Sequence, residues 1–324
     1  MEDDKTKNEW GVSTPHTCTF TNHCTFQRQR VRGIEETPML PYSNPSVCAA
    51  LKTSHWICAC FSDSHCSIKM RKVAIVTGGA GGIGRGITQV LLQQAPKVEW
   101  NVHVVDFSRA TIEDAKTFFK DYVDAGRVSF QEGDCGDHLV AKAAVDNALK
   151  TFGHLNLLVN NAGGGGFVPF LEQTPEGWMK VINSNLSSCF YFSQAATPAL
   201  TETYGSIINI SSTRAFQSEP NTEAYSASKG GICGLTHAMA ASLAHKVKVN
   251  CVCPGWIDVS GPEWGPGRTQ LEIKDSDRSQ HHSNRIGTPR DIAEAILYLE
   301  GAGFVSGQTI TIDGGMSVKM IYEE

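Results

Sequence analysis

Short β-branched runs alternate with longer helix-compatible stretches along residues 72–160. The β-branched runs cover 72–77, 100–105, 127–131 and 155–160. The helix-compatible stretches reach from Gly84 to about Gln94, and then cover 109–121 and 137–152. Strands that alternate with helices predict a parallel sheet with helices on both faces. We therefore expect an α/β fold with a doubly wound parallel sheet.

Three further strands and three further helices are expected in the second half of the chain. The strands lie at 205–212, 247–252 and 309–315, and the helices lie at about 174–203, 221–244 and 289–299. Thr288 followed by Pro289 is typical of a helix start, because threonine caps a helix and proline fits its first position. The whole pattern predicts about seven strands inside a three-layer αβα sandwich.

Residues 256–285 break this pattern. They mix Trp, Gly, Pro and charged residues without clear periodicity, and a segment of that length is usually a lid or a binding loop. Trp256 and Trp264 either line a substrate pocket or cover a hydrophobic edge, and the sequence favours neither. His281 and His282 are adjacent in a polar stretch, which is more typical of surface residues than of a metal pair. We expect no metal site.

Residues 1–69 do not share the periodicity of the rest. They show no sustained period of 2 or 3.6 and are rich in Thr, Ser, Pro, Cys and His. They hold six of the eleven cysteines, but no Cys-x-x-Cys pair is present, and Cys58-x-Cys60 is too tight for a zinc knuckle. We expect a disordered leader, or a misassigned upstream extension that precedes a natural start at Met70.

Composition excludes several other classes of protein. The net charge of −5 offers no basic surface for nucleic acid, and no apolar run approaches the roughly 18 residues that span a bilayer. The acidic start lacks the apolar segment of a signal peptide, and the tail carries no peroxisomal signal. Eleven cysteines, an odd number, favour free thiols in a reducing compartment. We expect a cytoplasmic protein that binds neither nucleic acid nor membrane.

Glycines cluster at the end of the first expected strand. The stretch Thr77-Gly-Gly-Ala-Gly-Gly-Ile-Gly84 lies between that strand and a helix. Glycines there permit a tight turn and the close approach of a pyrophosphate, and the helix N-terminus adds free N–H groups and a positive dipole end. The position between strand and helix strengthens a signal that is weak alone. We expect Gly78, Gly82, Ile83 and Gly84 to contact a dinucleotide cofactor.

Acidic and amide residues follow the next strands. Asp106 lies 22 residues after Gly84, close to the separation of about 20 expected for a carboxylate that binds the adenosine ribose. Such a carboxylate repels a 2′-phosphate, so it favours NAD over NADP, although Arg109 weakens that preference. Asp134 follows the third strand and is expected to meet the adenine. The turn Asn160-Asn-Ala-Gly163 follows the fourth, and its small residues would keep open the crevice where the strand order reverses.

Tyr225 and Lys229 stand four residues apart in an expected helix. Residues at this spacing lie on one helical face, so the phenol and the ammonium are expected to point the same way. A free phenol titrates near pH 10, and a neighbouring cation favours the phenolate. The pair is therefore a candidate proton-transfer group, although a packed ring beside a solvated amine is the commoner outcome of this spacing alone.

Together these segments resemble the short-chain dehydrogenase/reductase (SDR) family over about residues 70–320. The resemblance is carried by four motifs, which are Thr77-Gly-x-x-x-Gly82-x-Gly84, Asn160-Asn-Ala-Gly163, Tyr225-x-x-x-Lys229 and Pro254-Gly255. It implies a Rossmann-type, NAD(P)-binding catalytic domain at 70–324 that interconverts a secondary alcohol and a ketone by hydride transfer. It also implies a homo-oligomer, a tetramer or a dimer, built on the helices at 174–203 and 221–244.

The resemblance implies a catalytic tetrad of Asn, Ser, Tyr and Lys, which maps onto Asn185, Ser212, Tyr225 and Lys229. Ser212 lies 13 residues before the tyrosine, as in the family, whereas strand alternation points the alternative, Ser211, the other way. Asn185 lies 27 residues before Ser212, with Asn183 as the competing choice.

The resemblance also implies a role for each member of the tetrad. The tyrosine transfers the hydroxyl proton, and the serine hydrogen-bonds the substrate oxygen. The lysine favours the phenolate and binds the nicotinamide ribose, and the asparagine holds a water that links the lysine to solvent. The nicotinamide ring carries the hydride.

The expected cofactor contacts combine the glycine turn, the strand ends, the Tyr–Lys pair and the turn at Pro254. They are Gly78, Gly82, Ile83, Gly84, Asp106, Asp134, Asn161, Ala162, Gly163, Tyr225, Lys229, Pro254, Gly255 and Ile257. In the family, a threonine two residues after the position of Ile257 contacts the nicotinamide amide. Here that position is Val259, and the next residue, Ser260, is a candidate substitute.

We expect NAD as the cofactor, and a sugar, a small cyclic or aliphatic alcohol, or a 3-oxoacyl thioester as the substrate. The alternative is a catalytically silent nucleotide-sensing or scaffold protein of the same fold. Such proteins often lose the tyrosine or the lysine while they keep the glycines. The intact tetrad therefore favours the enzyme.

Overall fold

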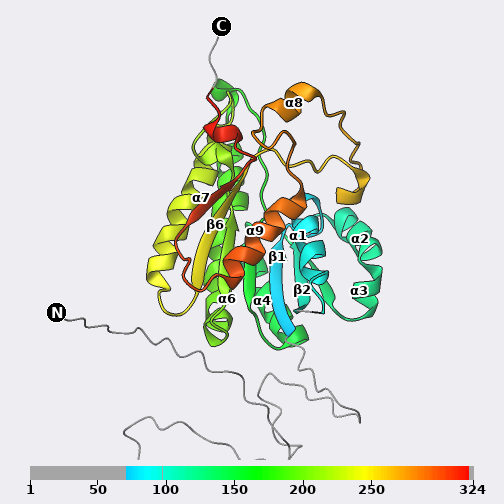
Figure 1. Ribbon diagram of the computed structural model, residues 1–324. Helices are drawn as coiled ribbons and strands as arrows, with labels where there is room; N and C mark the ends of the chain where they lie inside the picture. Colours follow the sequence, from blue (N-terminus) through cyan, green and yellow to red (C-terminus); the bar gives the residue numbers. More distant parts are fainter. Residues whose placement is uncertain (1–70, 97, 321–324) are drawn as a thin grey trace, which may run out of the picture. The chain divides into compact units, whose positions relative to one another are not determined.

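The computed structural model describes residues 71–96 and 98–320 (Figure 1). The expectations for the leader at 1–69 and for a start at Met70 lie outside these described residues. None of the helices within the described ranges carries an apolar stretch long enough to cross a membrane.

Within the described residues, seven parallel strands form one sheet with the order β3-β2-β1-β4-β5-β6-β7. The strands are β1 (Arg71–Thr77), β2 (Glu99–Asp106), β3 (Val128–Glu132), β4 (Leu157–Asn160), β5 (Ser206–Ile210), β6 (Lys248–Pro254) and β7 (Thr309–Ile312). The chain builds outward from β1 to β3, returns to the other side of β1 with β4, and continues to β7. The order therefore reverses between β1 and β4, where ligands bind in doubly wound sheets. The predicted fold class is confirmed.

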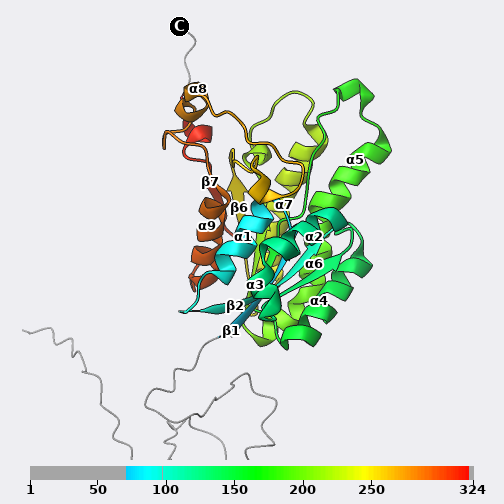
Figure 2. The ribbon, with the colours of Figure 1, turned by 90° about the vertical axis from the view of Figure 1, so that its right-hand side faces the viewer.

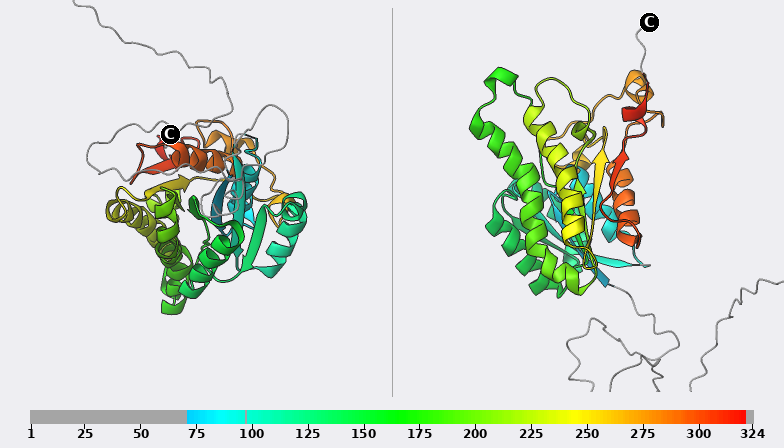
Figure 3. Two further views of the ribbon diagram at one scale, coloured as in Figure 1. Left: turned by 90° about the horizontal axis from the view of Figure 1, so that it is seen from below. Right: turned by 90° about the vertical axis from the view of Figure 1, so that its left-hand side faces the viewer.

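Helices cover both faces of the sheet (Figures 2 and 3). One layer contains α1 (Gly82–Leu92), α2 (Arg109–Phe118), α3 (Lys120–Asp124) and α9 (Pro289–Gly301), and the other contains α4 (His138–Phe152), α6 (Ser188–Glu202) and α7 (Glu223–Ser242). Alternate side chains of β1 point into the hydrophobic cores on the two faces of the sheet. Val73 and Ile75 pack with α4 and α6, whereas Ala74 and Val76 pack with α1 and α9. Burial of each such Val or Ile side chain is worth roughly 1.5–3 kcal/mol.

Two expected helices differ in detail. The stretch at 109–121 divides into α2 and α3 at Phe119, which leaves helical backbone angles (φ −98°, ψ 20°) while its ring stays buried. The stretch at 174–203 contains α5 (Pro175–Ile182), a π-helical segment η3 (Asn183–Ser187) and then α6. A π-helical turn inside a helix is frequent at functional sites.

The segment between β6 and α9 holds only short helices in the described structure, as the missing periodicity predicted. These are η5 (Pro262–Trp264) and α8 (Asp275–Ser279). The segment ends where the Asp291 carboxylate accepts hydrogen bonds from the Thr288 N–H and hydroxyl, both at 2.8 Å. Arg285 adds two contacts to the same carboxylate, at 2.8 and 2.5 Å. The start of α9 at Pro289 is therefore fixed as the sequence predicted.

Candidate active site

A cavity of about 580 Å³ opens beside the carboxyl ends of β5 and β6. Ser212 follows β5, Tyr225 lies in the first turn of α7, and Gly255 follows β6. All three line the cavity, together with Trp256. The fold thus brings the expected serine and tyrosine to one space from two different elements.

The structure separates Ser212 from its alternative, Ser211. The Ser211 side chain is buried, and its hydroxyl donates to the backbone carbonyl of Lys229 at 2.7 Å. The Ser212 hydroxyl accepts the Arg214 N–H at 3.1 Å and lines the cavity beside Tyr225. Ser212 therefore reaches the cavity, whereas Ser211 joins the end of β5 to α7.

Tyr225 and Lys229 lie on the same face of α7, as their spacing predicted. The Lys229 Nζ atom lies 5.5 Å from the centroid of the Tyr225 ring. It donates to the Ile210 carbonyl at 3.0 Å, and the lysine side chain is buried. The ammonium is therefore held at the end of β5, beside the phenol.

Asn185 lies in the π-helical segment η3 and is completely buried. Its side-chain Nδ2 donates to the Ser228 hydroxyl at 2.9 Å, and its Oδ1 accepts the Gly164 N–H at 3.0 Å. A Cβ atom at Gly163 would lie 2.9 Å from this Oδ1 and 3.6 Å from the Lys229 Nζ. Asn185 thus lies near Lys229, and Gly163 lies between them.

The competing asparagine is oriented differently. The Oδ1 atom of Asn183 accepts a hydrogen bond from the Ser187 hydroxyl at 3.2 Å, four residues along the same segment. Its side-chain contact is therefore local. Asn185, in contrast, joins η3 to α7 and to the glycine loop after β4.

The glycine turn after β1 has the tight form that its sequence predicts. Gly78 takes a left-handed backbone (φ +61°), and a Cβ atom at Gly84 would lie 2.0 Å from the Gly78 carbonyl oxygen. The Thr77 hydroxyl oxygen accepts the N–H groups of Asn161 and Ala162, both at 2.9 Å. The Asn161 Nδ2 donates back to the Thr77 carbonyl at 3.0 Å. Asn161 and Ala162 therefore join β4 to the turn.

The start of α1 fits an anion. Its N-cap, Gly81, offers no side-chain hydrogen bond, and its first turn carries no acidic residue. Gly82 has φ +53°, and a Cβ atom there would lie 3.4 Å from Nη2 of Arg268. The turn's N–H groups and this guanidinium fit the pyrophosphate of a nicotinamide dinucleotide. Arg268 belongs to the irregular segment and was not predicted as a cofactor contact. Ile83 was predicted as one, and its side chain packs against the core.

Asp106 ends β2 beside the glycine turn. Its carboxylate accepts the Ala80 N–H at 3.3 Å and the Ser108 N–H at 3.2 Å, and burial raises the pKa of Asp106. Arg109 is largely exposed, and its Nε lies 3.0 Å from the Glu132 carboxylate. The Arg109 guanidinium therefore pairs with Glu132 and not with Asp106.

Asp134 lies two residues beyond the end of β3 and is exposed. Its Oδ1 accepts the Gly136 N–H at 2.9 Å, which is a local turn contact. The structure therefore places the side chain on the sheet edge that carries Asp106 and engages it within its own turn.

The turn after β6 stays close to β7. Pro254 ends β6, and the Gly255 N–H donates to the Ile312 carbonyl at 3.0 Å. Ile257 is buried and pairs with Gly287 in a short parallel bridge. This backbone pairing ties the beginning of the irregular segment to its end.

The residues at the family's threonine position make other contacts. Val259 packs against the core that contains α1 and α9. The Ser260 hydroxyl donates to Asp258 Oδ1 at 2.6 Å and accepts the Leu271 N–H at 2.9 Å. The candidate substitute, Ser260, is therefore engaged in closing its own loop.

Three charged or amide side chains of the cavity wall were not predicted, namely Arg214, Glu219 and Gln280, and neither were the hydroxyls of Thr213 and Thr222. Arg214 and Glu219 form an ion pair within the loop between β5 and α7. The position of Arg214 two residues after Ser212 is a signal that could have identified it. Gln280 follows α8 and lies 55 residues from Tyr225, so no local pattern connects the two.

The two tryptophans of the irregular segment differ in place. Trp256 lines the cavity. Trp264 covers α1, where its ring would lie 3.3 Å from a Cβ atom at Gly86.

The expectation that His281 and His282 are surface residues is wrong for His281. This side chain is buried beside the Trp256 ring, with 6.5 Å between the two ring centroids.

Comparisons with known proteins extend over nearly the whole described fold. Residues 78–317 match the protein family described as enoyl-(acyl carrier protein) reductase. An uncharacterized oxidoreductase of Thermotoga maritima is 40% identical over 260 residues, which cover 78% of this chain and 98% of that protein. The 3-oxoacyl-[acyl-carrier-protein] reductase FabG of Chlamydia trachomatis is 32% identical over 76% of this chain and 98% of its own length.

A solved structure extends the same likeness to three dimensions. The short-chain dehydrogenase/reductase (glucose/ribitol dehydrogenase) of Brucella melitensis has a TM-score of 0.67 and 29% sequence identity. The match covers 76% of this chain and 97% of that one.

Proposed function

The chain belongs to the short-chain dehydrogenase/reductase family, and from that membership we propose that it interconverts a secondary alcohol and a ketone with Tyr225 as general acid and base. It is an NAD(P)-dependent oxidoreductase that acts on CH–OH groups. The observation that carries the proposal is the meeting of Ser212 and Tyr225 at one cavity, with Lys229 and Asn185 buried near them.

The proposed chemistry divides between the cofactor and four side chains. A bound nicotinamide cofactor supplies the acceptor or donor of hydride. Tyr225 takes the hydroxyl proton during oxidation and returns it to the ketone oxygen during reduction. Ser212 donates a hydrogen bond to the same oxygen. Lys229, which is held by the Ile210 carbonyl, favours negative charge on the phenol oxygen.

Asn185 supports the other three side chains indirectly, through the two groups that it hydrogen-bonds. Its carboxamide binds the Gly164 N–H on one side and the Ser228 hydroxyl of α7 on the other. The glycine loop is thereby held against the tyrosine, since a Cβ atom at Gly165 would lie 2.6 Å from the Tyr225 ring. We assign Asn185 the role of positioning residue for the loop and for the Tyr–Lys helix.

NAD is the preferred cofactor in this proposal. The Asp106 carboxylate lies at the end of β2 beside the glycine turn, where it suits ribose hydroxyls and repels a 2′-phosphate. Arg109, which could offset that repulsion, is directed toward Glu132. Separate titrations with NADH and NADPH test the preference, and equal affinities would remove it.

The substrate in this proposal is a small, polar, hydroxylated alcohol such as a sugar. Arg214, Glu219 and Gln280 present charged and amide groups on the cavity wall, and hydroxyl groups can bind all three. The ion pair between Arg214 and Glu219 balances their charges, which suits a neutral substrate. Small cyclic alcohols and 3-oxoacyl thioesters are the competing classes.

NADH formation by the purified full-length protein tests the proposal. The panel contains sugars, small secondary alcohols and 3-hydroxyacyl thioesters, and Tyr225→Phe is the matched variant. We expect turnover with at least one sugar and a loss of about 10²–10⁴-fold in Tyr225→Phe with NADH binding retained. Tight NADH binding without turnover on any compound would instead favour the nucleotide-sensing alternative.

A further inference from the structure

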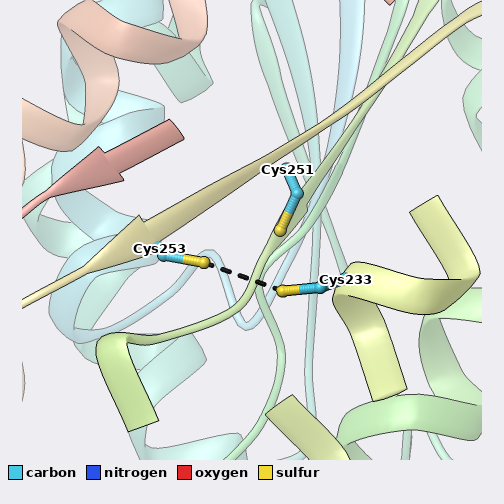
Figure 4. Close-up of side chains that lie close together, drawn as sticks. All are labelled: Cys233, Cys251 and Cys253. Carbon is cyan, nitrogen blue, oxygen red and sulfur yellow. Dashed lines mark hydrogen bonds between the residues drawn. The ribbon is translucent and has the colours of Figure 1, made fainter. Parts of the chain in front are cut away.

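Three cysteines converge on the side of the sheet that faces α7 (Figure 4). Cys233 comes from α7, one turn after Lys229, whereas Cys251 and Cys253 come from β6. Residues two apart in a strand point to the same face, so both β6 thiols meet the helix. The three Sγ atoms all lie within 4.8 Å of one another, and those of Cys233 and Cys253 are 3.9 Å apart.

The sulfur spacing matches that of a metal–thiolate centre. Zinc binds thiolate sulfur at about 2.3 Å, which places two sulfurs of a tetrahedral site about 3.8 Å apart. Three sulfurs around an ion in a flat, three-coordinate site at the same bond length are about 4.0 Å apart. The observed 3.9 Å between Cys233 and Cys253 lies between these values. The other two separations do not exceed 4.8 Å, so each would shorten by at most about 1 Å when all three sulfurs bind one ion.

The residues around the three thiols, and the thiols themselves, indicate which class of ion they would bind. Cys251 and Cys253 are buried in a core cluster with Ile232, and Leu186 packs against that cluster. The cluster that could hold an ion in the described structure contains thiols alone, without a carboxylate. Soft thiolate ligands favour Zn²⁺ and Cu⁺ over hard, oxygen-seeking cations such as Mg²⁺ and Ca²⁺.

We propose that Cys233, Cys251 and Cys253 form a three-thiolate binding site for a thiophilic metal ion, Zn²⁺ or Cu⁺. This site departs from the expectation of no metal site, which rested on the cysteine spacing in residues 1–69 and on the polar stretch around His281 and His282. It is separate from the catalytic cavity and does not depend on the proposed reaction.

One neighbouring hydroxyl distinguishes the two ions. The Ser211 Oγ lies 3.6 Å from the Cys233 Sγ. In a tetrahedral zinc site, an oxygen ligand and a sulfur ligand are about 3.5 Å apart. Ser211 is therefore placed to provide a fourth ligand to Zn²⁺. Cu⁺ would need only the three thiolates.

The site would join two elements that shape the active centre. The helix α7 carries Tyr225 and Lys229, and β6 leads directly into the turn at Gly255. The Ser211 hydroxyl already contacts both the Cys233 sulfur and the Lys229 carbonyl. A bound ion would fix α7 against β6 and is expected to raise the thermal unfolding temperature.

Metal retention by the full-length protein tests the proposal. The reduced protein is loaded under anaerobic conditions with Zn²⁺ or, separately, with Cu⁺, and it is desalted before metal and protein are measured. We expect Cys233→Ser to retain one ion per chain fewer than the unchanged protein. Cys189→Ser is the matched control, because Cys189 belongs to the same core cluster but lies outside the thiol triangle. The leader cysteines are the same in all variants, so they cancel in the difference.

Several outcomes decide the matter. Loss of the ion in Cys233→Ser and in a second variant, Cys253→Ala, supports the site, provided that both variants still bind NADH and unfold cooperatively. Weaker Zn²⁺ retention together with unchanged Cu⁺ retention in Ser211→Ala supports Ser211 as a fourth ligand to Zn²⁺, and equal retention of both ions in that variant removes Ser211 from the site. Equal metal content in all variants overturns the proposal. A Cys233–Cys253 disulfide in metal-free protein isolated from cells also overturns it.

Discussion

The nucleotide half of the domain, residues 71–161, and the catalytic half, residues 162–320, hold their candidate site residues in different ways. In the nucleotide half, the glycine turn is fixed by its own backbone conformation and by hydrogen bonds between Thr77, which lies next to it in the chain, and Asn161 at the end of β4. In the catalytic half, Asn185 and Ser212 reach their places only because η3, β5 and α7 pack together. The first half should therefore be most sensitive to backbone changes, and the second to loss of single polar groups.

The largest effect is expected from Gly84→Ala, which tests the nucleotide half. The added Cβ atom would meet the Gly78 carbonyl oxygen at 2.0 Å, so the turn must distort. We expect the free energy of unfolding to fall by about 4 kcal/mol, an effect of the size seen for severe core strain, and NADH binding to be lost. Urea unfolding and NADH fluorescence titration measure the two effects.

Gly234→Ala is the matched control in the catalytic half. An added Cβ atom there meets nothing within 4 Å on α7. Alanine is a better helix former than glycine, so this variant should gain up to about 1 kcal/mol. Similar losses in both variants would show that the contact with Gly78 is not what makes Gly84 necessary.

A pair of serine variants tests the catalytic half. Ser212→Ala removes the hydroxyl at the cavity, and we expect kcat to fall about 10²–10³-fold, as for other lost oxyanion donors, with little change in stability. Ser211→Ala leaves the Lys229 carbonyl without that donor and should cost about 1 kcal/mol of stability. Steady-state kinetics and urea unfolding distinguish the two. If Ser211→Ala lost more turnover than Ser212→Ala, Ser211 would be the catalytic serine and Ser212 the structural one.

Low pH is expected to destabilise the protein through His103, which lies in the nucleotide half. This side chain is buried on β2, and burial lowers the pKa of His103 to about 4 from its usual 6.5. The unfolded chain therefore binds the proton more readily, so stability falls as the pH drops from 6.5 to 4, by about 3 kcal/mol in all. His103→Leu should remove this slope from urea unfolding measured across that range. His237→Leu, on the exposed side of α7, should leave it in place.

The smallest effect is expected from Asp291→Asn at the start of α9. Hydrogen bonds from Arg285 lower the pKa of Asp291 to about 2, so the carboxylate stabilises the fold above pH 4 and loses that effect as the pH falls toward 2. Solvent screening reduces the contribution at pH 7 to about 1 kcal/mol. Asp146→Asn removes an exposed partner of Lys142 and should change stability far less. Equal losses at pH 7 would refute the role given to the Arg285 contact.

Much of the fold could be predicted because its signals are local. The β-branched runs, the glycine turn and the Thr288–Pro289 helix start each depend on a few consecutive residues, and the structure confirms them. The Tyr225–Lys229 pair belongs to the same class, since four residues of helix bring the two side chains to one face. The division of the stretch at 109–121 was missed because it depends on the burial of Phe119 beneath the helices.

Apart from the division of two helical stretches, the sequence by itself determined which segments form strands and helices, and it selected the residue types able to bind a dinucleotide and to move a proton. Only the tertiary structure decided that Trp256 rather than Trp264 lines the cavity, and that three cysteines from α7 and β6 meet. The physical reason is that backbone periodicity repeats over 2 or 3.6 residues and is written in neighbouring positions. Contacts between α7, β5 and β6 depend instead on how segments tens of residues apart pack across the sheet.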